Sequence, residues 1–247
     1  MPDQVTLITG AARNLGRALA VALGHGGNAV VVHHRGAGSA GDAAETARQV
    51  EAAGGRALIV AGDLAQVAAI RGLFDAALAA FGRIDVVINN AGMIVKKPIV
   101  EITEDDYDRS FAINARAAFF VMQEAARRIA DGGRIINIGT TLLAATTAGY
   151  GVYAGSKAPL EDFTRALARE VGARGITVNT IAPGPLDTPF YHAQESPQAV
   201  AYATHASVAN RLGLPSDIVP VVAFLASPGA QWLTAQTVFV NGGYLAR

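Results

Sequence analysis

Tyr153 and Lys157 are the two residues whose types and spacing most directly indicate chemistry. Side chains four positions apart project from the same face of a helix. Tyrosine has an ordinary pKa of about 10 and is a poor base at neutral pH, and a neighbouring ammonium lowers that pKa by favouring the phenolate. The pair is therefore predicted to transfer a proton, with Tyr153 as general acid or base and Lys157 as the group that tunes it.

A glycine-containing turn near the start of the chain, Thr-Gly-Ala-Ala-Arg-Asn-Leu-Gly-Arg at positions 9–17, separates an apolar run from a helical stretch. Such a turn lets the backbone approach a pyrophosphate, and the amides at the helix N-terminus face its negative charge. Asn14 tolerates a left-handed backbone, and its amide can donate to a phosphate. The turn is predicted to bind a dinucleotide, with a plain tight turn as the alternative.

The end of the second apolar run is where a dinucleotide site distinguishes NAD from NADP. An acidic residue there binds the ribose 2′-hydroxyl, whereas a basic residue accommodates the 2′-phosphate. This run ends in His34-Arg35 with no carboxylate before Asp42, and Arg13 lies in the glycine turn. Because an arginine fork binds two phosphate oxygens, the pattern favours NADP(H), with NAD(H) possible if the arginines are ordinary surface charges.

Short runs rich in Val and Ile alternate with longer, Ala-rich helical stretches along the chain. The runs show little polar alternation, as in strands buried on both faces: 5–9, 29–33, 57–61, 84–89, 134–138, 176–181 and 237–240. The helical stretches are 16–24, 41–53, 67–81, 107–130 and 156–173. This alternation predicts an α/β fold, a Rossmann-type doubly wound parallel sheet of about seven strands with helices on both faces.

The organisation of the chain shows no linker, so a single domain over residues 1–247 is expected, with a substrate flap at about 184–214, where Pro, Gly, Gln and Ser gather. Thr103 and Asp106 predict a capping box for a helix that begins near Glu104. In the stretch 156–173, four apolar residues recur at spacings of three and four and predict a core stripe: Leu160, Phe163, Leu167 and Val171. Pro159 fits a helix only near its first turn or at a kink.

Composition excludes several classes of function. Hydrophobic residues make up 51% of the chain, and Lys plus Arg balance Asp plus Glu at 20 each, so neither nucleic acid nor an anionic membrane surface is an expected partner. Without cysteine there is no disulfide or thiolate site, and the five histidines lack metal-ligand spacing, so no metal is predicted. No apolar run reaches about 20 residues and no signal region follows Met1, which predicts a cytoplasmic protein.

Further motifs complete an ordered series: Asn-Asn-Ala-Gly at 89–92, Asn114 within 111–116, Asn-Ile-Gly-Thr at 137–140, Tyr-Ala-Gly-Ser-Lys at 153–157, and Asn-Thr-Ile-Ala-Pro-Gly-Pro at 179–185. With the glycine turn, in which Asn14 replaces a middle glycine, they closely resemble the short, single-domain branch of the short-chain dehydrogenase/reductase family. The likeness runs from Val5 to Gly243, and the chain is similar to 3-oxoacyl-[acyl-carrier-protein] reductases and related ketoreductases.

The resemblance implies roles for individual residues. Lys157 also binds the nicotinamide ribose, Asn114 holds a water in a proton relay, and Thr140 replaces the serine thirteen positions before the tyrosine, with Thr141 as a competing neighbour. Asp63 contacts the adenine or caps the next helix. The implied cofactor contacts are Gly10, Arg13, Asn14, Leu15, His34, Arg35, Asp63, Leu64, Asn90, Ala91, Gly92, Tyr153, Lys157, Pro183, Gly184 and Leu186. The family usually forms homotetramers.

The candidate walls of the substrate pocket are mostly apolar and favour a hydrophobic ketone or an acyl chain over a charged sugar: Met93, Ile94, Leu142, Tyr150, Phe190 and Tyr191. Lys96 and Lys97 near the entrance either meet an acidic carrier or a coenzyme A phosphate, or belong to a solvated loop. The predicted activity is NADPH-dependent reduction of a small-molecule substrate that carries a ketone or a 3-oxoacyl-type carbonyl. The reverse reaction is the oxidation of the corresponding alcohol, as in an alcohol dehydrogenase.

Three alternatives remain open. One is an NAD-dependent dehydrogenase of a sterol, sugar or polyol. Another is a dinucleotide-binding sensor without catalysis, because Asn14 and Thr140 depart from the family pattern, although both Tyr153 and Lys157 are retained. A nucleotide-sugar epimerase or dehydratase is disfavoured, since those relatives have a turn that requires glycine where Arg13 stands.

Overall fold

A parallel sheet of seven strands runs through the described part of the chain, residues 4–145 and 147–246, in a computed structural model. The strand order is β3-β2-β1-β4-β5-β6-β7, and every neighbouring pair is parallel. The strands are β1 (Val5–Ile8), β2 (Ala29–His34), β3 (Arg56–Ala61), β4 (Val86–Asn89), β5 (Arg134–Ile138), β6 (Thr177–Pro183) and β7 (Thr237–Val240). The predicted fold class is confirmed. The two ends of the predicted domain, residues 1–3 and 247, lie outside the described residues.

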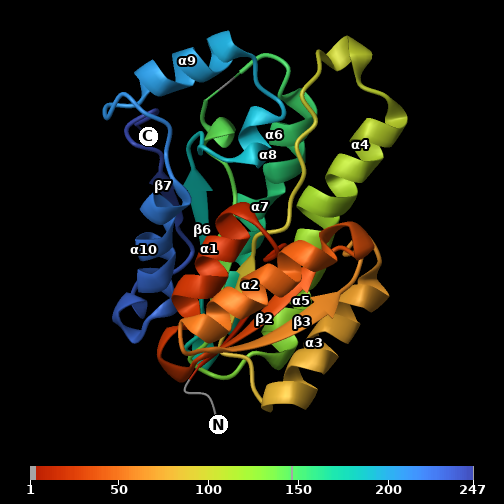
Figure 1. The fold of residues 1–247 in the computed structure, drawn as a ribbon, viewed down its shortest axis with the longest axis vertical. Coiled ribbons are helices and arrows are strands. Elements are labelled where there is room, and N and C mark those ends of the chain that lie inside the picture. Colours follow the sequence, from red (N-terminus) through yellow and green to blue (C-terminus); the bar gives the residue numbers. More distant parts are fainter. Residues whose placement is uncertain (1–3, 146, 247) are drawn as a thin grey trace.

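Helices cover both faces of the sheet (Figure 1). One face packs against α1 (Asn14–Leu23), α2 (Ala40–Ala52) and α10 (Pro215–Ala226), and the other against α3 (Val67–Phe81), α5 (Ala118–Arg128) and α7 (Pro159–Val171). Successive strand residues point to opposite faces, so Leu7 belongs to the α3 side and Ile8 to the α1 side. The central strands are therefore buried on both faces and carry apolar residues toward each, which explains the lack of alternation.

The prediction that every strand is buried on both faces is wrong for the edge strands β3 and β7. Residues of β3 are half-buried or exposed, with Ile59 41% exposed, and those of β7 are half-buried. Each of these strands has a neighbour on one side only, so less of its surface is covered. Their Val and Ile content resembled that of the central strands, and sequence alone did not separate the two classes.

Two of the predicted helices are interrupted. The predicted helix 107–130 is divided into three parts. They are α4 (Glu104–Phe111), which begins three residues earlier than the prediction, a π-helical turn (Ala112–Ala117) and α5. Farther along, α6 (Gly151–Lys157) begins before the predicted 156–173 helix, and Pro159 starts α7 at a first-turn position. Thr103 and Asp106 form the predicted capping box of α4. Short 3₁₀ turns occupy His25–Gly27, Ala37–Ser39, Ile99–Glu101, Thr141–Leu143, Gly172–Arg174 and Pro228–Ala230.

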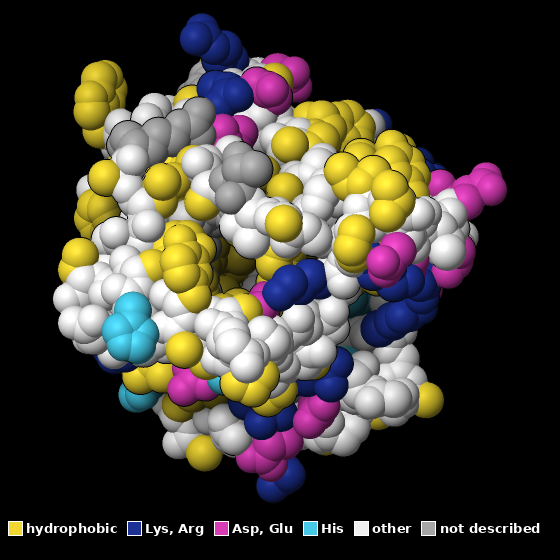
Figure 2. All heavy atoms as spheres, turned by 90° about the horizontal axis from the view of Figure 1, so that it is seen from above, with side chains coloured by type: hydrophobic (Ala, Val, Ile, Leu, Met, Phe, Trp, Pro, Cys, Tyr) yellow, Lys and Arg dark blue, Asp and Glu magenta, His cyan; other side chains and the backbone are white. Residues whose placement is uncertain are grey.

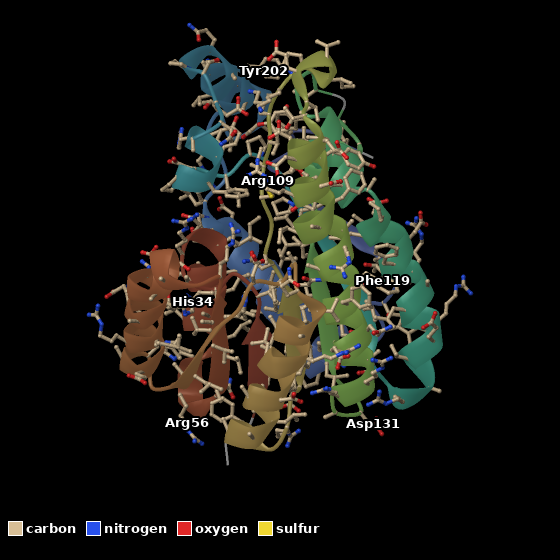
Figure 3. The ribbon with its side chains drawn as sticks, turned by 90° about the vertical axis from the view of Figure 1, so that its right-hand side faces the viewer. His34, Arg56, Arg109, Phe119, Asp131 and Tyr202 are labelled. Atoms are coloured by element: carbon tan, nitrogen blue, oxygen red, sulfur yellow. The ribbon has the colours of Figure 1, made fainter. Side chains whose placement is uncertain are left out.

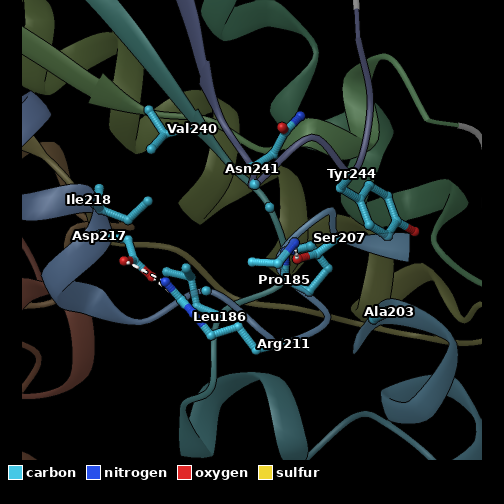
Figure 4. Close-up of a pocket in the computed structure, with 14 residues that line it drawn as sticks. Pro185, Leu186, Ala203, Ser207, Arg211, Asp217, Ile218, Val240, Asn241 and Tyr244 are labelled. Atoms are coloured by element: carbon cyan, nitrogen blue, oxygen red, sulfur yellow. Dashed lines mark hydrogen bonds and ion pairs between the residues drawn. The ribbon is translucent and has the colours of Figure 1, made fainter. Parts of the chain in front are cut away.

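Two helices lie above the carboxyl ends of the strands, α8 (Pro189–His192) and α9 (Pro197–Ala206), both within the predicted flap 184–214 (Figure 1). The base of the flap is closed by backbone bonds from Asp187 to Gly213 and from Gly213 to Pro185, 2.7 and 3.0 Å long. Arg211 forms an ion pair with Asp217 beside a small cavity of about 170 Å³ (Figure 4). Its action as a substrate flap stays a prediction.

Among the described residues, no helix combines the length and the apolar character that a membrane span requires.

Candidate active site

A large cavity of about 1070 Å³ opens at the carboxyl ends of the strands. It runs from His34 at the end of β2 to Tyr202 on α9, both labelled in Figure 3, and Figure 2 shows a hollow between hydrophobic side chains when the molecule is viewed from above. Every residue predicted to contact cofactor or substrate lines this cavity, as do Thr140, Tyr153 and Lys157. The sequence thus predicted its lining closely, although the role of each residue stays a prediction.

The glycine turn has the backbone that phosphate binding requires. Gly10 has φ +63° and Asn14 φ +51°, so Asn14 does adopt the left-handed conformation expected of it. A Cβ at Gly16 would lie 2.2 Å from the carbonyl oxygen of Gly10, which explains the glycine at the helix start. The first turn of α1 carries no acidic residue. The N-terminus of α1 therefore keeps its positive end open toward the cavity.

Asn90 fixes this turn to the end of β4. Its side-chain amide donates to the carbonyl oxygens of Thr9 and Gly10, both at 3.0 Å. In return, the hydroxyl oxygen of Thr9 accepts from the backbone N–H groups of Asn90 and Ala91 at 2.9 and 3.0 Å. The two motifs, far apart in the sequence, form one hydrogen-bonded unit.

His33 lines the cavity, although it is not among the site residues that the sequence predicted. Its Nδ1 accepts from the backbone N–H of Gly10 at 3.1 Å, and its Nε2 donates to the carbonyl oxygen of Gly62 at 2.9 Å. Burial lowers the pKa of His33 to about 4, so the ring is neutral, as both bonds require. The sequence did contain one signal for this role, a histidine near the end of the second predicted strand, where the site was expected.

The end of the cavity beside β2 and β3 carries the cationic groups predicted to bind a 2′-phosphate. Arg13 lies 3.8 Å from Asp42, and Arg35 lies 3.6 Å from Asp63, and the two arginine side chains are 66% and 82% exposed. Such exposed pairs contribute little to stability, so both guanidinium groups are available to a ligand. His34 is buried, with Nδ1 3.2 Å from the hydroxyl of Ser39.

The alternative role for Asp63 as an N-cap is wrong. The cap of α3 is Gln66, and the Asp63 carboxylate accepts instead from the backbone N–H of Ala65 at 3.1 Å. The cap lies three residues later than expected because a turn separates β3 from α3.

Tyr153 and Lys157 both lie on α6, as their spacing predicted, and both are buried. The side chain of Thr140 acts to lower the pKa of Tyr153, but burial has the larger effect and raises the pKa of Tyr153 to about 12. The neighbouring hydroxyl of Thr141 donates away from this pair, to the carbonyl oxygen of Ala182 at 3.1 Å. Of the two threonines, Thr140 is therefore the one that lies against Tyr153.

The expectation that Lys157 lowers the pKa of Tyr153 below its ordinary value is wrong for this structure. The Lys157 ammonium donates to the carbonyl oxygen of Ile138 at 2.8 Å, and burial lowers its own pKa to about 8. The largest influence on Tyr153 is burial and not the lysine charge. The sequence could not predict this balance, because it depends on how much water the folded cavity excludes.

Asn114 lies in the π-helical turn between α4 and α5, a geometry that is often found at functional sites. Its amide nitrogen donates to the carbonyl oxygen of Met93 and to the hydroxyl of Ser156, both at 2.9 Å, while its oxygen accepts from the N–H of Met93 at 2.9 Å. Asn114 is fully buried and does not line the cavity. It ties the loop after β4 to α6, and its water relay stays a prediction.

The substrate end of the cavity is less apolar than predicted. The six predicted wall residues are joined there by Lys96 and by Glu195, whose carboxylate forms an ion pair with Lys96 and accepts from the Tyr150 hydroxyl. Lys97 pairs with Asp106 at 2.6 Å. Neither lysine therefore belongs to a plain solvated loop. Sequence reasoning missed Glu195, since it lies in the irregular segment between α8 and α9, where no pattern indicates burial.

No group of three or more His, Cys, Asp or Glu side chains is arranged to hold a metal ion in the part of the chain that the structure describes.

Comparison with protein families and curated proteins places the chain among oxidoreductases. A family model described as enoyl-(acyl carrier protein) reductase matches residues 10–245. A short-chain type dehydrogenase/reductase of Picea abies is 38% identical over 97% of this chain and 92% of its own length. The hydroxynaphthalene reductase-like protein Arp2 of Metarhizium brunneum is 38% identical over 98% of this chain and 95% of its own.

Solved structures match over the whole fold. A structure described as a dehydrogenase of Burkholderia cenocepacia, with bound NADP, has a TM-score of 0.95 and 45% identity, covering 100% of this chain and 95% of that one. The angucycline C-6 ketoreductase LanV, also with bound NADP, has a TM-score of 0.92 and 36% identity, covering 99% and 96%. On these matches and on the series of motifs around one cavity, the chain belongs to the short-chain dehydrogenase/reductase family of NAD(P)-dependent oxidoreductases.

Proposed function

We propose that this protein is an NADPH-dependent reductase that delivers hydride to a ketone carbonyl, with Tyr153 as the general acid. The observation that carries the proposal is that the side chains of Thr140 and Tyr153 act on each other in the cavity that Lys157 also lines. Two hydroxyl groups side by side can bind one carbonyl oxygen, and a buried cation near them stabilises the negative charge that develops on it.

The residues present fit a phosphorylated dinucleotide. The left-handed turn at Gly10 and Asn14 and the N-terminus of α1 suit a pyrophosphate, and the exposed forks of Arg13 and Arg35 suit a 2′-phosphate. The bound NADP of the Burkholderia and LanV structures supports the same choice. When bound, the nicotinamide supplies the hydride. The alternative of an NAD-dependent dehydrogenase is disfavoured because Arg35, and not an acid, directly follows β2, and because the two acids that line this end, Asp42 and Asp63, are paired with the arginines.

The chain's own residues act on the proton and on orientation. Tyr153 donates its hydroxyl proton to the carbonyl oxygen, and the raised pKa keeps this proton in place through the neutral range. Thr140 orients the carbonyl, and Lys157 binds the nicotinamide ribose and places its charge near the phenol oxygen. Asn114 positions α6 through its bond to Ser156, and the backbone of Gly92 leaves room for Asn114 and Lys157, which a Cβ would meet at 3.2 Å.

The walls of the substrate end favour a ring-bearing ketone. Four tyrosines and one phenylalanine line this region: Tyr150, Tyr191, Tyr202, Tyr244 and Phe190. Such side chains form flat contacts with aromatic or alicyclic rings. Relatives named for hydroxynaphthalene and angucycline reduction support the same class. A 3-oxoacyl ester is the second carbonyl substrate to test, because the matching family model is described by an acyl-carrier substrate.

We also propose a homotetramer in the cytoplasm, as the family resemblance implies. Large apolar side chains exposed on α4, α5, α10 and the segment before β7 support self-association: Tyr107, Phe119, Phe224 and Trp232. Light scattering after gel filtration should give four times the chain mass.

Tyr153→Phe is the decisive experiment. NADPH oxidation is followed with a panel of aryl ketones, diketones and β-ketoesters, and NADPH affinity is followed by calorimetry. The variant should lose at least about 100-fold in kcat, because the proton donor is gone, while its NADPH affinity stays within about threefold. Unchanged turnover of a good ketone would show that Tyr153 is not the acid, and absence of NADPH binding in the wild type would remove the reductase assignment.

A further inference from the structure

A buried carboxylate lies at the substrate end of the cavity, in a position that the reaction chemistry does not use. Glu195 lies between α8 and α9, and its side chain is only 3% exposed, yet it lines the cavity. One carboxylate oxygen faces the ammonium of Lys96, which follows β4, and the other accepts from the hydroxyl of Tyr150, which precedes α6. Three separate segments therefore meet at this acid.

One cation and two phenols surround Glu195. Lys96 supplies a paired cation and also lies 5.2 Å from the centre of the Tyr150 ring. Burial and the carboxylate raise the pKa of Tyr150 and that of Tyr191, the latter to about 12, so both phenols remain donors. The other acids that line the cavity, Asp42 and Asp63, lie at the opposite end beside the arginines.

The position of this acid brings it close to the reacting group. The rings of Tyr150 and Tyr153 have centroids 6.0 Å apart, and Tyr150 donates to Glu195, so a substrate that presents its carbonyl to Tyr153 can reach Glu195 with its far end. A carboxylate has about four lone-pair positions, and Tyr150 and Lys96 use two of them. The remaining positions can accept from a ligand donor. A ligand anion would meet the carboxylate in a poorly solvated space, and the nearby cation, Lys96, is already paired with Glu195.

We propose that Glu195 is a specificity-determining residue that selects ketones with a hydroxyl group and rejects ketones with a carboxylate. The proposal rests on the ketone reductase function and adds the substrate class to it. The ion pair with Lys96 and the bond from Tyr150 hold the acid in place in the wall of the cavity.

Three matched probes test the selection: acetophenone, 3′-hydroxyacetophenone and 3-acetylbenzoate. In the wild type, kcat/KM should be about tenfold higher for the hydroxyl compound than for acetophenone, because one charge-assisted hydrogen bond is gained. For the carboxylate compound, kcat/KM should be at least about tenfold lower than for acetophenone, because the two carboxylates repel each other. Glu195→Gln keeps the shape but removes the charge. The ratio of kcat/KM for the hydroxyl compound to kcat/KM for the carboxylate compound should fall at least about tenfold in this variant.

A purely structural role for Glu195 gives a different result. If the acid only fastens the segment between α8 and α9, Glu195→Gln lowers kcat/KM for the three ketones by one common factor and leaves the ratio unchanged, which would overturn the proposal. The matched control is Glu101→Gln, an exposed acid outside the cavity, which should leave both the values and the ratio unchanged.

Binding separates failure of the selection from failure of the proposed function. Calorimetric affinities of the same three ketones for the enzyme–NADP⁺ complex give the ratio without any turnover. If the wild type binds but does not reduce these ketones, the reductase function fails while the selection is still measured. If the wild type binds or reduces the hydroxyl and carboxylate ketones equally well, the selection is wrong whatever the turnover.

Discussion

The ring of His33 joins the end of β2 to the glycine turn, by accepting a hydrogen bond from the backbone N–H of Gly10 at 3.1 Å. The other ring nitrogen donates to Gly62 at the end of β3. One neutral imidazole thus connects the ends of three adjacent strands at the place where a pyrophosphate is expected. A protonated ring has no acceptor nitrogen, so the geometry depends on the charge of His33.

The first prediction concerns stability in acid. Burial lowers the pKa of His33 from 6.5 to about 4, so the unfolded chain binds more protons between these values. Stability is therefore complete above about 6.5 and falls as pH drops toward 4, by at most about 3 kcal/mol from this residue. The free energy of unfolding in urea, measured at pH 7 and pH 4.5, should fall less in His33→Gln than in the wild type.

The control for this measurement is His205→Gln, since His205 is exposed on α9. That variant should show the acid sensitivity of the wild type. Equal acid sensitivity in all three proteins would mean that His33 does not carry the effect. His33→Gln should also weaken NADPH binding, because the turn loses the ring that fixes Gly10.

The second prediction separates the two adjacent threonines. Thr140→Val removes the hydroxyl that contacts Tyr153, and kcat should fall about 100-fold, as for loss of one donor to a developing oxyanion. Thr141→Val removes a buried bond to Ala182, so its main effect should be a loss of about 1–2 kcal/mol in the free energy of unfolding. Steady-state kinetics and denaturation of both variants give the comparison. A larger kcat loss in Thr141→Val would reverse the assignment.

This pair shows what the sequence could not decide. Counting back from Tyr153 placed both threonines after β5, but adjacent residues point in opposite directions at the end of a strand. Which one faces the cavity depends on the register of β5 between β4 and β6, where Asn137 pairs with Asn89 and Thr180. That register is a property of the assembled sheet.

Other features were predicted from local rules alone. The left-handed backbone at Asn14 and the capping box of Thr103 and Asp106 follow from the conformational preferences of single residues, and the structure confirms both. Of the two positions that suit Pro159, a first turn or a kink, the structure shows the first turn. The buried position of Glu195 follows from no local rule. It results from contacts between segments about 45 and 99 positions apart in the chain.

The third prediction concerns the choice of cofactor. Arg35→Asp replaces an exposed guanidinium at the end of β2 by a carboxylate, which repels a 2′-phosphate and suits a free 2′-hydroxyl. The ratio of kcat/KM for NADPH to that for NADH should fall about 10- to 100-fold, as loss of a charge-assisted hydrogen bond predicts. Arg56→Asp is the matched control, because Arg56 begins β3 at the amino end of the strands, whereas His34 ends the neighbouring β2 at their carboxyl end (Figure 3). An unchanged ratio in Arg35→Asp would exclude contact with the 2′-phosphate.

The fourth prediction is that Lys157 costs stability. Burial lowers its pKa from 10.5 to about 8, so below pH 8 the folded protein holds a charge that the unfolded chain holds more easily. Lys157→Met should therefore raise the free energy of unfolding at pH 7, by at most about 3 kcal/mol, while its loss from the site abolishes reduction. Because the folded lysine is neutral between about 8 and 10.5 and the penalty fades over this range, the gain should shrink at pH 10. Urea denaturation of both proteins at pH 7 and pH 10 measures this difference, and a variant less stable than the wild type at pH 7 would show that the bond from Lys157 to Ile138 outweighs the burial of the charge.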